Sequence, residues 1–290
     1  MKRLGYLLIL ILTCAACSPS QKKESGKPSI TVTLEPLRYF AETLGADYFD
    51  FHSMVPKGSS PETYDPTPQQ LVTLGKSQAY FKIGYIGFEQ SWMQKLIDNT
   101  PNMKVFDTST GVELIHEKAH VHGDHIHEGG VEPHIWNSTL NAKIISKNIC
   151  EALSELDPAH KNIFEHRLDS LNGVISATDS LIRHYLIEAD THFLIYHPAL
   201  SYFARDYHLN QISIEEGGKE PSPAQIQNLI KDCKKNNTRV IFVQQEFDVR
   251  NAKLIADEIG VRIVTINPLS YDWNKEMIQV AKALSHQSHD

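Results

Sequence analysis

Cysteine is scarce in this chain of 290 residues, and its distribution excludes the usual thiolate sites. Of the four cysteines, Cys14 and Cys17 lie in the N-terminal segment, whereas Cys150 and Cys233 lie far apart in the sequence. We therefore expect no cysteine-based zinc framework in the folded part of the chain. Cys150 and Cys233 could pair in an oxidising compartment, but we favour the interpretation that each is a small buried apolar group.

Other familiar motifs are also missing. The sequence has no G-x-S-x-G turn of the serine hydrolases and no G-x-x-x-x-G-K-[S/T] loop that would bind nucleotide phosphates. A net charge of −7 argues against nucleic acid as a partner. The unusual feature is a high content of histidine, fifteen residues in all.

No long apolar run occurs either, but a short one stands at the N-terminus. Lys2 and Arg3 precede an apolar stretch, residues 4–16, that is too short to span a bilayer. Cys17 follows this stretch, and Ala15-Ala16-Cys17 resembles the lipobox of bacterial lipoproteins. We therefore expect residues 1–17 to be a lipoprotein signal peptide with Cys17 lipidated, Cys14 being the alternative. The polar residues 18–28 are then a flexible tether, and the protein is anchored by lipid in the periplasm or cell envelope.

From Ser29 onward, short β-rich runs alternate with longer amphipathic runs, which is typical of parallel sheets with crossover helices. The pattern occurs twice. The predicted fold class is therefore α/β with two lobes, residues 29–156 and 189–290, each a four-stranded parallel sheet flanked by helices. The strands are expected near residues 30–33, 49–54, 79–83 and 104–106 in the first lobe and near 193–196, 211–214, 240–243 and 262–266 in the second.

One long, rigid helix is predicted over residues 157–188, where it joins the lobes. Asp157 can cap its N-terminus, Pro158 suits the first helical position, and apolar residues follow at helical spacing. Such a helix would be about 45 Å long at a rise of 1.5 Å per residue. Gly173 is its one weak point. A strut of this kind would limit how far the lobes swing apart.

Potential metal ligands follow four of the predicted strands: Glu62, His134, His197 and Asn267. Open parallel α/β sheets bind ligands beyond the carboxyl ends of their strands, which is where these residues are expected. A single histidine or glutamate in such a place is usually only hydrogen-bonded or solvated. Two imidazoles and few oxygens converging from both lobes would instead suit a borderline-soft cation such as zinc.

The motifs around these residues resemble those of a known family. They are residues 58–68, Gly87-Phe88-Glu89, Glu132-Pro133-His134-Ile135-Trp136, residues 196–203 with His197-Pro198-Ala199, and Ile266-Asn267-Pro268-Leu269. In this order they resemble the metal-binding solute-binding proteins of ABC importers, the ZnuA and TroA-like group called cluster A-I. The resemblance implies a monomeric, non-enzymatic protein that holds a metal between two lobes and delivers it to a transmembrane permease. It also implies that His134 and His197 are metal ligands.

Two positions depart from the family pattern. Glu62 stands where the family usually has histidine, and Asn267 stands where it usually has an acidic residue. The two changes offset each other in charge. Glu62 is therefore expected to be the anionic ligand, with Asn267 supplying its carbonyl oxygen or holding a water. Asp272, on the same loop, is the substitute if Asn267 does not reach.

A histidine-rich loop is predicted over residues 113–130. It contains His116, His120, His122, His125 and His127 among glycines and charged residues, a composition that attracts metal ions. Members of the family that are specific for zinc have a similar loop, so the resemblance favours zinc as the transported metal. Manganese or ferrous iron is the alternative, because Glu62 moves the ligand set toward oxygen. A solvated loop with incidental histidines is the simpler alternative.

Two further functions remain open. His116-Glu117-Lys118-Ala119-His120 matches the H-E-x-x-H pattern of zinc proteases, in which two histidines lie one helical turn apart. That motif needs a long, core-packed helix, whereas here the segment is charged and bracketed by glycines. An adhesin role at the cell surface is also compatible with a lipid anchor and requires no closed coordination sphere.

Overall fold

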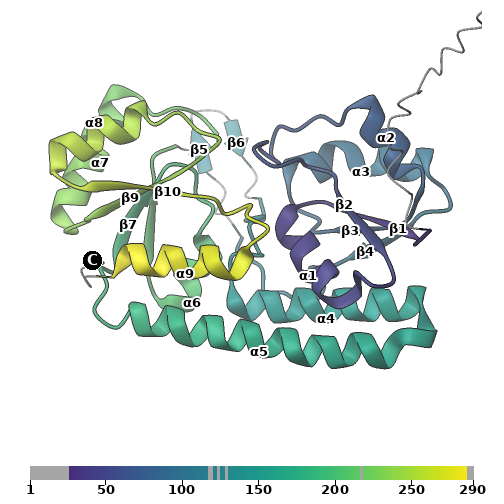
Figure 1. The fold of residues 1–290 in the computed structure, drawn as a ribbon. Coiled ribbons are helices and arrows are strands. Elements are labelled where there is room, and N and C mark those ends of the chain that lie inside the picture. Colours follow the sequence, from purple (N-terminus) through teal and green to yellow (C-terminus); the bar gives the residue numbers. More distant parts are fainter. Residues whose placement is uncertain (1–25, 117–119, 123–124, 128–129, 216–217, 286–290) are drawn as a thin grey trace, which may run out of the picture.

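Two four-stranded parallel sheets, one in each lobe, form the framework of the protein (Figure 1). The computed structural model describes residues 26–116, 120–122, 125–127, 130–215 and 218–285. The strand order is β2-β1-β3-β4 in the first lobe and β10-β9-β7-β8 in the second, so the predicted α/β class is confirmed. The strands are β1 (Ser29–Val32), β2 (Asp50–Ser53), β3 (Ser77–Lys82), β4 (Lys104–Asp107), β7 (His192–Ile195), β8 (Asn210–Ser213), β9 (Val240–Gln244) and β10 (Arg262–Ile266).

Helices flank both sheets, and two long ones run beneath them in Figure 1. The first lobe carries α1 (Glu35–Gly45), α2 (Pro68–Leu74) and α3 (Gly87–Asn99). The second carries α6 (Ser201–Tyr207), α7 (Pro223–Lys235), α8 (Arg250–Ile259) and α9 (Trp273–Leu284). Between the lobes in the sequence lie α4 (Thr139–Leu156) and α5 (Lys161–Tyr185).

Helix α5 is the connecting helix, although it begins later than expected. It contacts α1 of the first lobe and α9 of the second, and its apolar stripe is buried at Phe164, Leu171, Ile175 and Ile182. The residues before it, Pro158–His160, form a separate 3₁₀ turn. Asp157 has two roles: its backbone N–H bonds to the carbonyl of Leu153 and ends α4, and it is also the N-cap residue of this 3₁₀ turn, with Pro158 at the first position. The 25 residues of α5 span roughly 37 Å.

The hydrophobic core continues from one lobe into the other. Trp273 of α9 is buried and packs edge-on against Phe40 of α1, with ring centroids 5.2 Å apart. Its indole N–H donates to the carbonyl of Trp136 at 2.7 Å, and the indole N–H of Trp136 donates to the carbonyl of Pro268 at 2.8 Å. Separating the lobes would therefore expose aromatic surface and break buried hydrogen bonds, which disfavours wide opening.

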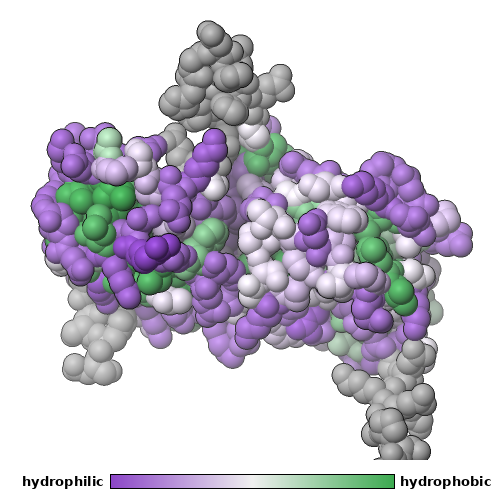
Figure 2. All heavy atoms as spheres, turned by 90° about the horizontal axis from the view of Figure 1, so that it is seen from above, coloured by the Kyte–Doolittle hydropathy of each residue, from purple (hydrophilic) through white to green (hydrophobic). Residues whose placement is uncertain are grey.

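The outer surface differs from this interior. In the view of Figure 2 it is largely hydrophilic, and hydrophobic side chains show as separate patches on both lobes. Cys150 and Cys233 are buried and unpaired, as predicted. None of the helices in the described ranges is both long enough and apolar enough to cross a membrane. Residues 1–25, with Cys17 and its alternative Cys14, lie outside the described part, so the signal peptide and lipid anchor stay predictions.

The histidine-rich segment was expected to be a loop, and this is wrong for two stretches of its backbone. Strands β5 (His120–His122) and β6 (His125–His127) pair antiparallel, with His120 opposite His127 and His122 opposite His125. Before them, His116 pairs with Val131 in an isolated bridge. Alternation of valine or isoleucine with histidine suits a strand, which explains the difference. Residues 117–119, 123–124 and 128–129 lie outside the described part.

This pairing also removes the basis of the zinc-protease alternative. The H-E-x-x-H motif requires its two histidines on one turn of a helix. Here His116 lies in a β-bridge, and His120 begins strand β5. The two residues therefore do not share a helical face.

Replacement of Gly173 by alanine should stabilise the protein. Gly173 lies in the interior of α5, and a Cβ added there would meet no atom within 4 Å. The Gly173→Ala variant should gain roughly 0.5–1 kcal/mol in the free energy of unfolding, because alanine loses less conformational entropy in a helix. Urea denaturation measures this change, and an unchanged or lower midpoint would contradict it.

Candidate metal centre

A small cavity lies between the lobes, beyond the carboxyl ends of strands in both sheets. Its volume is about 30 Å³, which is enough for an ion or a water molecule. Three of the four predicted ligands, Glu62, His134 and His197, line it. The full lining consists of Ser60, Pro61, Glu62, His134, Trp136, His197, Ala199, Gln244, Glu246, Phe247, Pro268 and Leu269.

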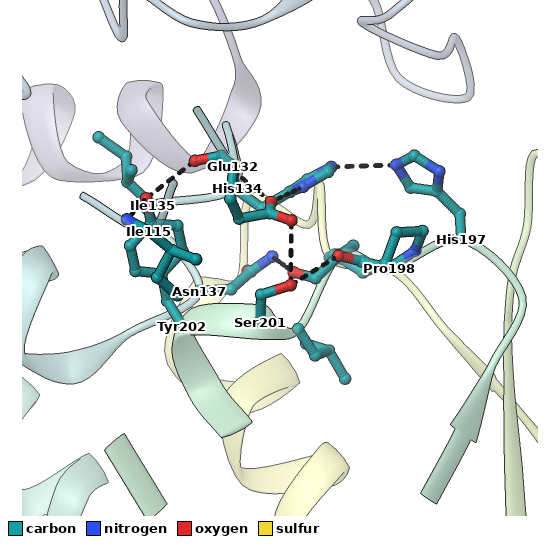
Figure 3. Close-up of polar contacts among 12 residues, drawn as sticks. Ile115, Glu132, His134, Ile135, Asn137, His197, Pro198, Ser201 and Tyr202 are labelled. Atoms are coloured by element: carbon teal, nitrogen blue, oxygen red, sulfur yellow. Dashed lines mark hydrogen bonds and ion pairs between the residues drawn. The ribbon is translucent and has the colours of Figure 1, made fainter. Parts of the chain in front are cut away.

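The two histidines face each other across this cavity. Their Nε2 atoms lie 3.2 Å apart, and Figure 3 shows the two rings pointing toward one another from different segments of the chain. Two ring nitrogens bound tetrahedrally to one zinc ion, each about 2.0–2.1 Å from it, lie about 3.3–3.4 Å apart. The spacing of His134 and His197 therefore matches one edge of such a coordination sphere.

A carboxylate lies at the opposite nitrogen of each ring. His134 Nδ1 contacts Glu132 Oε1, and His197 Nδ1 lies 2.5 Å from Glu215 Oε1. Both glutamates are buried. A carboxylate at Nδ1 favours the tautomer with the proton on that nitrogen, which leaves the Nε2 lone pair free. Two such lone pairs facing each other repel unless a proton or a metal ion lies between them.

The charges around His134 favour a cation at this point. Burial by itself would lower the pKa of His134, but the carboxylates of Glu132, Glu62 and Glu215 outweigh it and the pKa is raised. Burial would likewise raise the pKa of Glu132, yet its interactions with His134 and the hydroxyl of Ser201 lower it. Both shifts show that positive charge on the imidazole side and negative charge on Glu132 stabilise each other.

His197 is held in place through its backbone and its ring. The side-chain amide of Gln244, at the end of β9, donates to the carbonyl of His197 at 2.6 Å and accepts from its backbone N–H at 3.3 Å. The ring of Phe247 stacks on the imidazole, with centroids 5.3 Å apart and planes 17° apart. These contacts restrict the rotation of His197 before any ligand arrives.

Glu62 brings a carboxylate with an unused oxygen. Its Oε2 accepts a hydrogen bond of 3.1 Å from the backbone N–H of Gly87, at the start of α3. Its Oε1 is buried and has no hydrogen-bond partner among the described residues. A buried carboxylate oxygen without a partner is costly unless a cation or a proton donor binds it.

Asn267 and Asp272 do not line the cavity. The side-chain oxygen of Asn267 accepts the backbone N–H of Leu269 at 3.2 Å, in a turn of its own loop. Asp272 is exposed and pairs with Lys275 at 3.2 Å. Pro268 and Leu269 provide the wall of the cavity where Asn267 was expected.

The site is only partly preformed. Across residues 26–285, gaps excepted, no three histidine, cysteine, aspartate or glutamate side chains lie close enough together to hold an ion as they stand. The two histidines lie close together, whereas the carboxylate of Glu62 lines the cavity without joining them in such a group. Any ion bound here would draw at least one side chain inward.

Several residues of the site were missed from the sequence. Glu215 follows β8, and Gln244 and Glu246 follow or end β9, so the rule that ligands bind at carboxyl ends of strands could have identified them. Glu132 was named only as part of the motif around His134, although its carboxylate contacts Nδ1 of that histidine. Nothing in the sequence indicates that Phe247 belongs to the site, because an aromatic residue in a loop can pack against many kinds of neighbour.

Solved structures and curated sequences resemble this chain over most of its length. A crystal structure of ZnuA is 34% identical, with a TM-score of 0.81, covering 88% of this chain and 97% of that one. The manganese ABC transporter substrate-binding lipoprotein PsaA of Streptococcus pneumoniae is 28% identical, covering 91% of this chain and 88% of that protein. The zinc-binding lipoprotein AdcA of S. pneumoniae is 27% identical over 93% of this chain, which spans only 56% of AdcA.

A family model extends this likeness to nearly the whole described chain. The model for the periplasmic component A of the zinc-uptake complex, ZnuA, matches residues 30–286. The resemblance stated from the motifs is confirmed, and so is the prediction of binding without catalysis, because this is a family of transport proteins. The relatives include proteins named for zinc and for manganese, so the comparisons leave the metal undecided. The chain belongs to the ZnuA family of metal-binding, solute-binding components of ABC importers.

Proposed function

We propose that this protein captures zinc at His134, His197 and Glu62 and delivers it to the permease subunit of an ABC importer while anchored to the membrane through Cys17. The observation that carries the proposal is the pair of facing Nε2 atoms, 3.2 Å apart. Each imidazole has a carboxylate at its other nitrogen, which directs its lone pair into the cavity. A dication between the two nitrogens would relieve their repulsion and complete the charge balance of the buried glutamates.

Capture would proceed in two stages. The histidines are fixed first, His134 by Glu132 and His197 by Gln244 and Phe247. An ion that meets this pair attracts the unpaired oxygen of Glu62, which closes the site from the first lobe. Release to the permease reverses this step, so it needs a shift of the Glu62 loop and no wide parting of the lobes. The continuous core favours such a small movement.

Zinc is preferred because two imidazoles and one carboxylate match its usual ligands. The histidines of residues 113–130 support the same choice, since they would gather zinc near the cavity. Manganese and ferrous iron are the alternatives, because they accept oxygen ligands more readily than zinc does. Three protein donors leave a fourth position. Asn267 and Asp272 could fill it only by giving up their present partners, Leu269 and Lys275.

Removal of the Glu62 carboxylate should weaken metal binding. The Glu62→Ala variant loses the only anionic donor of the proposed set, and its zinc affinity should fall by about tenfold or more. Asp65→Ala is the matched control, since Asp65 lies on the same loop, is exposed and bonds to Trp92 away from the cavity. Competition calorimetry with a chelator measures both. Equal zinc affinity in wild type and Glu62→Ala would remove Glu62 from the site.

A methyl group at position 87 should have a similar effect without replacing a ligand residue. A Cβ on Gly87 would lie 2.4 Å from the carbonyl oxygen of Glu62 and 3.1 Å from its Oε2. The Gly87→Ala variant must therefore displace the Glu62 loop, and zinc affinity should fall while the helices remain folded. Gly173→Ala serves as the control, because its added methyl group contacts nothing. Calorimetry combined with circular dichroism checks both parts, and full affinity in Gly87→Ala would contradict the proposed role of this loop.

Deletion of the histidine-rich segment should lower zinc capacity and spare the cavity. The deletion should cover residues 117–129, so that the bridge of His116 with Val131 and the hydrogen bond from Ile115 to Tyr202 are kept. Elemental analysis of the zinc-loaded protein should then show one tightly bound ion and fewer weakly bound ones. If the shortened protein retained no zinc, the segment and not the cavity would be the principal site.

A further inference from the structure

The oxygen donors of the cavity differ in whether they are already engaged. Apart from Glu62, three lining residues carry a side-chain oxygen: Ser60, Gln244 and Glu246. The hydroxyl of Ser60 accepts the backbone N–H of Glu62 at 3.4 Å. Both polar atoms of the Gln244 amide bond to the backbone of His197. For the carboxylate of Glu246 the described residues provide no hydrogen bond and no ion pair.

We propose that Glu246 is the fourth protein ligand of the bound metal, and that it sets the balance between zinc and harder cations. This inference rests on the proposed function of the cavity. The ligand set then consists of His134, His197, Glu62 and Glu246. The second lobe supplies the second carboxylate, from the loop between β9 and α8.

The position of Glu246 in that loop makes it suitable. The residue lies between Gln244, which clamps the backbone of His197, and Phe247, which stacks on its imidazole. A loop fixed on both sides to a proposed ligand brings Glu246 to the same cavity with little freedom to leave. The nearest basic residue in sequence, Arg250, is paired with Asp248 at 2.8 Å, so it does not neutralise Glu246.

The charge of the cavity supports the same assignment. Glu62 has one buried oxygen without a partner, and Glu246 adds a second carboxylate on the opposite lobe. Among the ligands themselves, two carboxylates balance the charge of a dication, while Glu132 and Glu215 contact the far side of the two imidazoles. Carboxylate oxygens also suit manganese better than imidazole does. Glu246 should therefore support manganese binding more strongly than zinc binding.

The test compares Glu246→Gln with Asp248→Asn, which makes the same change of charge on the same loop but outside the cavity lining. Glutamine keeps the shape of the side chain, so the metal-free melting temperature of both variants should match that of wild type. Competition titrations with a metal-sensitive dye would be made separately with Zn²⁺ and Mn²⁺. In Glu246→Gln the Mn²⁺ affinity should fall about tenfold or more, and the Zn²⁺ affinity by a smaller factor. Asp248→Asn should titrate as wild type.

A second measurement reports coordination directly. Co²⁺ bound to the wild-type protein has a visible absorption spectrum that depends on the number and type of its donors, and Glu246→Gln should change that spectrum while Asp248→Asn should not. The inference is overturned if Glu246→Gln has the affinities and the Co²⁺ spectrum of wild type. If Glu62→Ala and His197→Ala lose binding in that same experiment, only the assignment of Glu246 fails. If those two variants also bind normally, the proposed site itself is wrong.

Discussion

The site depends on one close pair of side chains, His134 and His197, whose Nε2 atoms lie 3.2 Å apart. Glu132 and Glu215 contact the Nδ1 atom on the far side of each ring, which favours a proton on that nitrogen and leaves the two Nε2 atoms directed at each other. The carboxylates of Glu132, Glu62 and Glu215 favour positive charge on His134, at a defined point between the lobes.

The rigidity of this pair comes from hydrogen bonds that join the lobes. His134 precedes α4 in the sequence, yet its segment is bonded to α6 of the second lobe: Ser201 donates to the carboxylate of Glu132, and Tyr202 donates to its carbonyl (Figure 3). Asn137 donates to the carbonyl of Ala199 in the same region. Both histidines are thus held by contacts with the second lobe, and Glu62 lines the same cavity from the first.

Much of the fold could be predicted from the sequence, because the signals are local. The spacing of apolar residues along α5 and the alternation of strands with helices depend only on burial and on backbone geometry. The differences from the prediction were also local. The connecting helix begins after Asp157 as a separate 3₁₀ turn and continues as α5 from Lys161, and the alternating histidines and apolar residues at 120–127 form paired strands.

By itself the sequence determined the α/β class, the two motifs that contain His134 and His197, and the family to which these motifs are similar. Only the tertiary structure decided which oxygen atoms accompany them. The side-chain oxygen of Asn267 accepts a hydrogen bond from the backbone N–H of Leu269, while one oxygen of Glu62 has no partner among the described residues. Glu132 and Glu215 contact the Nδ1 atoms of the two imidazoles. The physical reason is that a carboxylate or amide finds its partner through space. Its hydrogen bonds join residues from distant parts of the chain, so no local pattern records them.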